Sequence, residues 1–391
     1  MSTATDQQRP SLKAPLLLVN QTIGPLFVGV VAAAQRRTPV VLYRGVPYRR
    51  TPGAVRLFTW LAYSLQLAWH LGCRGHRYRS LLVVSNPPLA PLLAPLARRP
   101  YALLLYDLYP QVLAQLGLPP VVLAPITALW SWANRRVFAS AERVFTLSDA
   151  MAAELRPAFA SDALWRRKVV VIPPWADTSR LQPNPAAAAA FRHQLGIDPG
   201  HLLITYSGNL GLTHPLEPLV DAAAILPAPD VQLLLIGEGH KRVALERRAS
   251  ALRSAPVCLR FLDPLPLEDL PASLSAADLA VVALDGPAAS ASLPSKTFSA
   301  LACGTPLLAL APFSSALAQL VQFHGCGLVI EPGPAAATGL ADAITALAAD
   351  RSRLQQLAAN ALAASRHYTP ANADRLLDAW LGADGCHHRL V

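Results

Sequence analysis

Cysteine is scarce and scattered in this chain, and its pattern argues against both a disulfide-linked protein and a zinc-binding protein. The 391 residues contain five cysteines and no Cys-x-x-Cys pair. An odd number of widely spaced cysteines predicts neither a disulfide framework nor a zinc site, so reduced thiols are expected. His387 and His388 have no further ligands at metal-binding spacing, and we expect neither a metal nor another cofactor. The five cysteines are Cys73, Cys258, Cys303, Cys326 and Cys386.

A run of apolar residues long enough to cross a membrane is also missing. The best candidate, residues 57–71, is shorter than the roughly 20 residues that a spanning helix needs, and it contains Gln66 and His70. The first residues lack the charged-then-apolar pattern of a signal peptide. We therefore expect a cytoplasmic protein in which residues 57–71 form an amphipathic or buried helix.

Acidic residues are few in the first half of the chain. Residues 1–180 carry 21 Lys and Arg against 7 Asp and Glu, whereas residues 181–391 carry 13 against 17. A basic surplus in one half suits an anionic partner, such as lipid headgroups or a phosphorylated acceptor, although a solvated basic face is the plainer alternative. Nucleic acid is not expected, because no nucleic-acid motif is present and the arginines are not interleaved with aromatic residues.

Tryptophans lie close to arginines at two places in this basic half. Aromatic and basic side chains together suit a membrane interface, whereas a single tryptophan is more often part of a core. We therefore expect peripheral contact with an anionic membrane surface, at the inner face of the cell membrane. The tryptophans concerned are Trp60, Trp69, Trp130 and Trp132.

Hydrophobic residues make up 53% of the chain, which excludes a disordered protein, and they fall in short runs between helical patterns. This alternation predicts parallel sheets with helical crossovers. The predicted strands are 16–19, 40–43, 81–84, 102–106, 144–147 and 169–172 in the first half, and 202–206, 231–236, 257–261, 279–282, 307–310 and 327–330 in the second.

The expected fold is α/β, with two tandem doubly wound (Rossmann-like) domains that face each other across a cleft. Residues 1–178 form the first domain and residues 190–365 form the second. A linker rich in Pro and Ala, residues 175–189, joins them. Residues 366–391 form a last helix and a tail that pack back towards the first domain.

Two glycine-rich turns follow predicted strands of the second half. Residues 202–211 read LLITYSGNLG, and residues 231–239 read VQLLLIGEG. Such turns offer bare backbone N–H groups and a helix N-terminus to an anion, commonly a phosphate. Lys296 adds a positive charge at a third turn of this kind, so the three together predict a pocket for a nucleotide or a nucleotide sugar.

Several segments resemble the family 4 glycosyltransferases of the GT-B fold. The strong resemblance runs from about residue 147 to residue 327, and the order and spacing of the motifs carry it. The P-S-K segment resembles a branch of the family that acts in surface-polysaccharide synthesis. The motifs are LSDAM at 147–151, VIPPWAD at 171–177, YSGNLG at 206–211, LIGEG at 235–239, SAADLAVVAL at 275–284 and LPSKTFSALACGTPLLA at 293–309.

The resemblance implies that the second domain holds a nucleotide diphosphate sugar and that the first holds the acceptor. It also implies transfer with retention of configuration and without a metal. The implied donor-binding residues are Gly208, Asn209 and Gly211 with His214 nearby, Gly237, Glu238 and Gly239 beside the base and ribose, and Ser295 and Lys296 beside the diphosphate or sugar. The chain departs from the family where many members carry two glutamates, because Ala291 and Ser299 occupy those positions.

Two residues are candidates for the chemistry. Lys296 can offset the negative charge that develops on a departing nucleotide, or it is a plain lysine at a helix start. Asp107 follows an apolar strand and can orient or deprotonate an acceptor hydroxyl, or it caps the next turn. Asn20 and Gln21 follow the first strand and are candidate acceptor-binding residues. Glu238 binds ribose hydroxyls or only complements a helix dipole.

The predicted function is transfer of a hexose-type sugar from a nucleotide diphosphate sugar to a growing glycan. The acceptor is expected to be lipid-linked, for example through a polyprenyl diphosphate. Two alternatives stay open at this point: a nucleotide-sugar 2-epimerase of the same fold, and a catalytically silent scaffold that binds a nucleotide sugar.

Overall fold

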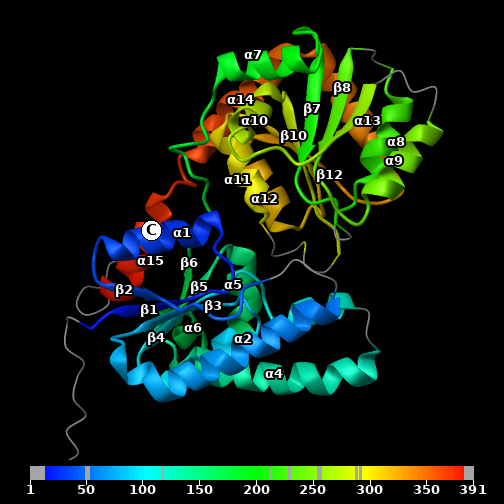
Figure 1. Cartoon of the computed structure of the whole chain (residues 1–391). Helices are drawn as coiled ribbons and strands as arrows, with labels where there is room; N and C mark the ends of the chain where they lie inside the picture. Colours follow the sequence, from blue (N-terminus) through cyan, green and yellow to red (C-terminus); the bar gives the residue numbers. More distant parts are fainter. Residues whose placement is uncertain are drawn as a thin grey trace, which may run out of the picture. The chain divides into compact units, whose positions relative to one another are not determined.

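The computed structural model describes residues 14–48, 53–116, 119–211, 214–227, 230–252, 258–286, 289 and 293–382. The chain forms two compact units, which are drawn in Figure 1. Residues 1–173 and 371–391 form the N-terminal unit, and residues 174–370 form the C-terminal unit. The first crossing between the units therefore lies at residue 173 rather than at the predicted residue 178.

The N-terminal unit is built on a six-stranded parallel sheet in the order β2-β1-β3-β4-β5-β6. All residues of β1, β3 and β4 are buried, as expected of parallel strands that helices cover on both faces. In Figure 1, α1 and α15 lie on one side of this sheet and α2 on the other. The strands are β1 (Leu16–Val19), β2 (Val40–Leu42), β3 (Leu81–Val84), β4 (Tyr101–Leu104), β5 (Arg143–Thr146) and β6 (Val169–Val171). The α-helices are α1 (Pro25–Gln35), α2 (Gly53–Arg74), α3 (Ala90–Leu93), α4 (Pro120–Ser140), α5 (Asp149–Leu155), α6 (Asp162–Lys168) and α15 (Ala371–Leu381).

The last helix, α15, is part of the N-terminal unit. Its inner face buries Leu376, Leu377 and Trp380. The Trp380 indole donates a hydrogen bond to Glu142 Oε2 at 3.2 Å, so the helix packs beside the start of β5.

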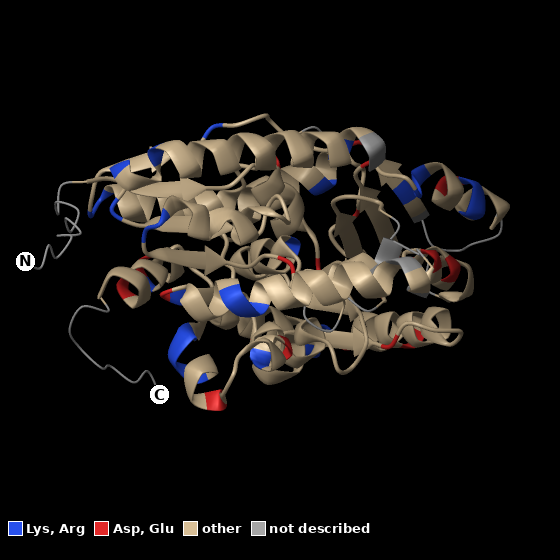
Figure 2. Cartoon of the chain, turned by 90° about the horizontal axis from the view of Figure 1, so that it is seen from below, with Lys and Arg blue, Asp and Glu red and all other residues tan. Residues whose placement is uncertain are grey.

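Two long helices of the N-terminal unit, α2 and α4, expose apolar side chains along one side. Figure 2 shows that long stretches of both helices carry no charged residue. The helix α2 has 22 residues and is longer than the predicted 57–71. Even so, no helix among the described residues is both long and apolar enough to cross a membrane. The exposed large apolar side chains are Val55, Leu57, Phe58, Leu61, Leu65 and Trp69 on α2, and Val121, Ile126, Leu129 and Trp132 on α4.

The C-terminal unit repeats the design with a second six-stranded parallel sheet, in the order β12-β11-β10-β7-β8-β9. One face packs on α8 and α13, and the other packs on α11, α12 and α14. The strands are β7 (Leu202–Ser207), β8 (Val231–Ile236), β9 (Cys258–Leu262), β10 (Leu279–Ala283), β11 (Leu307–Leu310) and β12 (Gly327–Ile330). The helices are α7 (Pro185–Gln194), α8 (Glu217–Ile225), α9 (Arg242–Ala251), α10 (Leu270–Ala276), α11 (Ser295–Ala302), α12 (Ala316–His324), α13 (Ala336–Ala349) and α14 (Arg351–Ser365).

One part of the predicted linker is wrong, because residues 185–189 are helical. The helix α7 begins at Pro185, and the Asn184 side chain caps it by accepting a hydrogen bond from Ala187 N at 3.0 Å. An Asn cap followed by Pro at the first helical position is a favoured helix start. The linker proper therefore ends at Asn184.

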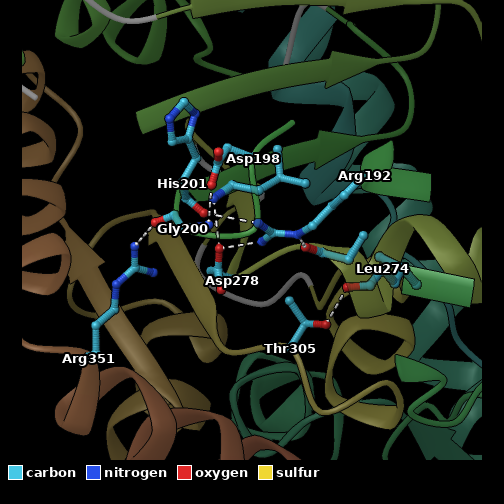
Figure 3. A network of polar contacts seen from close by, with 10 residues as sticks. Arg192, Asp198, Gly200, His201, Leu274, Asp278, Thr305 and Arg351 are labelled. Atoms are coloured by element: carbon cyan, nitrogen blue, oxygen red, sulfur yellow. Dashed lines mark hydrogen bonds and ion pairs between the residues drawn. The ribbon is translucent and has the colours of Figure 1, made fainter. Parts of the chain in front are cut away.

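The amino ends of β7 and β10 are held together by a polar network around Arg192 of α7 (Figure 3). The Arg192 guanidinium forms an ion pair with Asp278 at 2.6 Å and donates to the carbonyl oxygens of His201 and Ala276. Asp278 also accepts a hydrogen bond from Leu203 N at 2.7 Å. This network fixes one end of the sheet, and the opposite, carboxyl end carries the predicted donor turns.

Candidate functional site

In the sheet of the C-terminal unit, the direction in which successive strands are added reverses at the first strand, β7. From β7 the chain builds β8 and β9 on one side, and it then returns to place β10 on the other side of β7. Connections that leave the carboxyl ends of β7 and β10 therefore run in opposite directions, and such a switch point is where open α/β sheets bind ligands. Gly208 follows β7, and Lys296 lies in the connection after β10.

The turns after β7 and β8 pack backbone against backbone. Gly208 N donates to Ile236 O at 2.9 Å, and Leu210 N donates to Glu238 O at 2.8 Å. A Cβ atom on Gly237 would lie 2.0 Å from Gly208 O, and one on Gly239 would lie 2.5 Å from Leu210 O. Gly237 also has a φ of +140°, which favours glycine. These glycines are therefore required for the two turns to come together.

Two basic residues that the sequence analysis did not single out hold the turns in place. Arg242 Nη1 donates to Gly237 O at 2.6 Å and to Leu262 O at 2.9 Å. Lys241 N donates to Leu210 O at 2.9 Å, while Lys241 Nζ pairs with Glu217 at 2.9 Å. A Lys-Arg pair at a helix start carries no sequence signal for such a role, because the role depends on which carbonyl groups the fold brings near.

Lys296 is the second residue of α11, and its Nζ lies inside the protein. The Nζ atom is shielded from solvent and has no hydrogen-bond partner within the described residues. It lies 3.8 Å from the centre of the Tyr206 ring and 2.9 Å from the position that a Cβ on Gly208 would occupy. Burial lowers the pKa of Lys296 to about 7. Lys296 and Gly208, two predicted donor residues, thus lie together.

Tyr206 supports this arrangement from the end of β7. Its ring lies under the Lys296 Nζ, and its hydroxyl donates a hydrogen bond to Asn209 O at 2.6 Å. Tyr206 therefore shapes the turn that contains Gly208 and also contacts the lysine. Sequence reasoning placed Tyr206 in a motif but gave it no role.

His214 also lies close to Lys296. Its Nδ1 donates a hydrogen bond to Ala283 O at 2.8 Å, at the end of β10. Burial is the largest cause that lowers the pKa of His214 below its usual value. The imidazole is therefore neutral at pH 7, and it contributes a hydrogen-bonding nitrogen rather than a positive charge.

The remaining predicted donor residues are distributed around these turns. The side chains of Glu238 and Ser295 are exposed, and Gly211 faces the Asn209 side chain, whose Nδ2 lies 2.6 Å from the position of a Gly211 Cβ. Ser299 lies within α11, whereas Ala291 lies outside the described residues.

The predicted acceptor residues gather at the carboxyl end of the other sheet. Gln21 follows β1, and its backbone N donates to Asn86 O, after β3, at 2.9 Å. The Gln21 side chain donates to Val46 O at 3.0 Å. Asn20 Nδ2 and Gln21 Oε1 are shielded from solvent and have no hydrogen-bond partner within the described residues. Two predicted residues therefore present unused polar groups at the switch between β1 and β3.

Asp107 follows β4, the neighbour of β3 in this sheet. Ser85 Oγ accepts hydrogen bonds from Tyr106 N at 2.8 Å and from Asp107 N at 3.3 Å, which fixes the backbone here. The Asp107 side chain is exposed, lines a small pocket with Tyr109 and Trp130, and caps no turn in the described part of the chain. The Tyr109 and Trp130 rings stack with centroids 5.7 Å apart. The pocket has a volume of only about 10 Å³, about the space of one water molecule, so a sugar hydroxyl could meet Asp107 only at its exposed side.

Metal chemistry has no obvious ligand set in the described ranges. No group of three or more His, Cys, Asp or Glu side chains is placed there to hold a metal ion. The described cysteines Cys73, Cys303 and Cys326 are free thiols.

Comparisons with known proteins cover both units. Residues 188–363 match the family described as "Glycosyl transferases group 1", and residues 24–175 match the family described as "Glycosyl transferase 4-like domain". The chain is 30% identical over 260 residues to the D-inositol 3-phosphate glycosyltransferase of Nocardia farcinica, an alignment that covers 64% of this chain and 54% of that protein. It is 32% identical over 168 residues to WcaI of Escherichia coli, which is named for colanic acid biosynthesis, across 42% of this chain and 40% of WcaI.

The matched region thus spans about half the length of these curated relatives. Among solved structures, Anabaena Alr3699/HepE, crystallised with UDP and glucose, superposes with a TM-score of 0.70 at 19% identity. The superposition covers 95% of this chain and all of that one. At this level of identity the likeness establishes the fold.

Proposed function

The chain belongs to the family 4 glycosyltransferases of the GT-B fold, and we propose that it transfers a sugar from a nucleotide diphosphate sugar to a glycan acceptor. The observation that carries the donor part is the buried Lys296 Nζ, which lies beside Gly208 at the switch point of the second sheet and has no hydrogen-bond partner among the described residues. The fold neighbour HepE was crystallised with UDP and with glucose, which supports a donor of this class.

In this proposal, the turns after β7 and β8 bind the diphosphate through backbone N–H groups. Breaking the bond between sugar and diphosphate builds negative charge on the departing nucleotide. Lys296 and the N-terminus of α11 offset that charge. The proposal includes retention of configuration and chemistry without a metal, and both rest on the family resemblance.

The acceptor part of the proposal places the accepting hydroxyl at Asp107. An exposed carboxylate beside an aromatic wall can orient the hydroxyl or take its proton. Asn20 and Gln21 supply further hydrogen-bonding groups at the neighbouring strand ends. Replacement of the Asp107 carboxylate by an amide, in Asp107→Asn, is expected to abolish transfer while leaving donor binding intact.

The proposal also includes a lipid-linked acceptor at the inner face of the cell membrane, in surface-polysaccharide synthesis. Trp69 and Leu65 on α2, and Trp132 on α4, are exposed by 63%, 72% and 52%. The Arg136 guanidinium lies 4.1 Å from the centre of the Trp132 ring, and such aromatic and basic pairs suit a lipid interface. The relation to WcaI supports a role in polysaccharide synthesis.

A donor panel tests the enzymatic proposal. The purified chain is incubated with UDP-, GDP- and ADP-sugars and a membrane extract, and nucleotide release is measured. We expect release with one donor class, dependent on the extract, and loss of release but not of binding in Asp107→Asn. Tight binding without release from any donor would favour a silent scaffold, and sugar isomerisation without acceptor would favour an epimerase.

A vesicle experiment tests the membrane part separately. We expect the chain to float with vesicles rich in anionic phosphatidylglycerol at low salt, and less at high salt because salt screens the basic surface. The paired change Leu65→Ser with Trp69→Ser should reduce flotation. Phe323→Ser, which removes a side chain 85% exposed on the C-terminal unit, is the matched control. Absence of binding at every salt concentration would end the membrane proposal.

A further inference from the structure

We infer that Lys296 is a proton-coupled phosphate ligand: its buried amine, which faces the Tyr206 ring and has no hydrogen-bond partner among the described residues, takes up a proton when the diphosphate of a sugar nucleotide binds beside Gly208. This inference rests on the proposed function and specifies how the donor site is regulated. It makes donor affinity, and not only catalysis, dependent on pH.

No anion contacts the Lys296 amine in the part of the chain that the structure describes. The Nζ atom faces the Tyr206 ring and the backbone of Gly208, and it has no hydrogen-bond partner among the described residues. An aromatic face stabilises an ammonium only partly, and far less than a carboxylate does. A buried ammonium without a counter-ion is therefore costly, and the neutral amine is the less expensive form.

The carboxylates on neighbouring elements are engaged elsewhere or exposed. Glu217 of α8 pairs with Lys241, and Glu246 of α9 pairs with Arg242, as does Asp263 after β9. The Asp285 carboxylate, after β10, accepts a hydrogen bond from Gly286 N at 2.6 Å. The Glu238 side chain, after β8, is exposed.

The remaining titratable groups near the lysine do not neutralise it either. His214 donates its Nδ1 proton to Ala283 O, and burial keeps its imidazole uncharged. Burial raises the pKa of Tyr206 far above its usual value, so the ring under the lysine carries no negative charge. No described residue of the C-terminal unit named above supplies the negative charge that would stabilise an ammonium at this position, and a bound diphosphate would supply it.

Burial lowers the pKa of Lys296 to about 7, so the lysine is poised to change charge near neutrality. A bound diphosphate would raise this pKa by supplying negative charge next to the amine. The amine then takes one proton from solvent, and no other bond forms or breaks. With a midpoint near pH 7, uptake would approach about 0.9 proton at pH 8 and only about 0.1 at pH 6.

The first experiment observes the lysine directly. The chain has only four lysines, Lys13, Lys168, Lys241 and Lys296, so a sample labelled with ¹³C at the lysine Cε gives few signals. The signal that is missing from Lys296→Met belongs to Lys296. We expect it to titrate near neutrality without nucleotide and to shift its midpoint upward when UDP-glucose, or another sugar nucleotide that binds, is added.

Calorimetry then measures the coupled proton. Sugar nucleotides are titrated into the full chain in two buffers with different ionisation enthalpies, because the difference in binding heat between the buffers gives the number of protons taken up. A sugar nucleotide has no phosphate group that titrates near pH 7, so this uptake belongs to the protein. We expect proton uptake that rises from pH 6 to pH 8, and an affinity that falls by up to about tenfold per pH unit above the midpoint. Lys296→Arg, which keeps a permanent charge, should bind without proton uptake.

The outcomes separate this inference from the proposed function. Binding without proton uptake, or a Lys296 signal that titrates near 10 in the free chain, would overturn the inference and leave the proposed donor site standing. Failure of every UDP-, GDP- and ADP-sugar to bind would overturn the proposed function, and the inference would fall with it.

Discussion

Single residues set the geometry of the donor turns, and Gly237 has the least room. A methyl group on Gly237 would meet Gly208 O at 2.0 Å, and its φ of +140° disfavours any side chain. We expect Gly237→Ala to push the two turns apart, weaken sugar-nucleotide binding at least tenfold and destabilise the C-terminal unit by about 2 kcal/mol or more. Nucleotide titration and urea unfolding measure the two effects.

Gly333→Ala is the control that isolates the close contact. Gly333 has a similar φ of +150°, but a methyl group there would meet nothing within 4 Å. Gly333→Ala therefore introduces the same backbone strain, from a side chain at a positive φ, without displacing Gly208. Equal effects of the two substitutions on nucleotide binding would show that backbone strain alone, rather than the meeting of the turns, matters.

The buried Lys296 also leads to a prediction about the stability of the chain without any ligand. The Lys296 pKa is lowered from 10.5 to about 7 in the folded chain, so between these pH values the unfolded chain binds more protons than the folded one. Stability therefore rises with pH across this window. We expect urea unfolding to show this rise in the natural chain and not in Lys296→Met. Parallel pH profiles of the two proteins would contradict it.

How much of the site the sequence predicts depends on the kind of contact. Gly208 and Gly237 lie in recognisable turns after strands, and Lys296 lies at a helix start within the P-S-K segment, so local patterns are enough to single them out. The contact between Lys296 of α11 and Tyr206 of β7 joins two residues that are 90 positions apart in the sequence. Arg242 binds the carbonyl groups of Gly237, in the turn after β8, and of Leu262, at the end of β9. Such roles arise only from packing, and no local pattern encodes them.

At the scale of elements, the Arg192 network in Figure 3 joins α7 to the starts of β7 and β10. The Arg192 side chain is only 14% exposed and pairs with an Asp278 side chain that is 26% exposed. We expect Arg192→Ala to destabilise the C-terminal unit by about 2–4 kcal/mol, because it leaves Asp278 and two carbonyl groups poorly satisfied. Urea unfolding and faster amide hydrogen exchange in β7 are the measurements.

A more exposed ion pair of the same unit provides the comparison. Arg248 pairs with Asp221, and these side chains are 48% and 32% exposed. Solvent screens such a pair, so Arg248→Ala should cost less than about 1 kcal/mol. If both substitutions had the same small effect, the Arg192 network would not be what holds α7 to the sheet.

The elements themselves were largely predictable, for a physical reason. Buried parallel strands are short apolar runs, and β1, β3, β8, β11 and β12 have the predicted bounds. The predictions failed where apolar periodicity is weak. The start of α7, Pro185 followed by five alanines, resembles a linker, and the cap at Asn184 was the overlooked signal. Residues 336–365 form two helices, α13 and α14, because the Asp350 side chain caps the second by accepting a hydrogen bond from Arg353 N.

At the scale of the whole molecule, the chain crosses between its two units twice, so the N-terminal unit contains both ends of the sequence. It is completed by α15, which buries Leu377 fully against it and is tied to it by ion pairs from Arg36 and Arg37 to Asp374. The stability of the N-terminal unit should therefore depend on a helix encoded near the end of the chain.

Leu377→Ala tests this dependence. Removing a fully buried leucine side chain should destabilise the N-terminal unit by about 2–4 kcal/mol. Six of the seven tryptophans lie in that unit, and only Trp175 lies in the other, so fluorescence follows the N-terminal unit during urea unfolding. We expect the fluorescence midpoint to fall in Leu377→Ala.

Leu357→Ala, which truncates a buried leucine of α14, is the control. It should leave the fluorescence midpoint in place and shift the hydrogen exchange of the C-terminal unit instead. The reverse pattern would mean that α15 contributes its stability to the second unit, contrary to its contacts with Glu142 and α1.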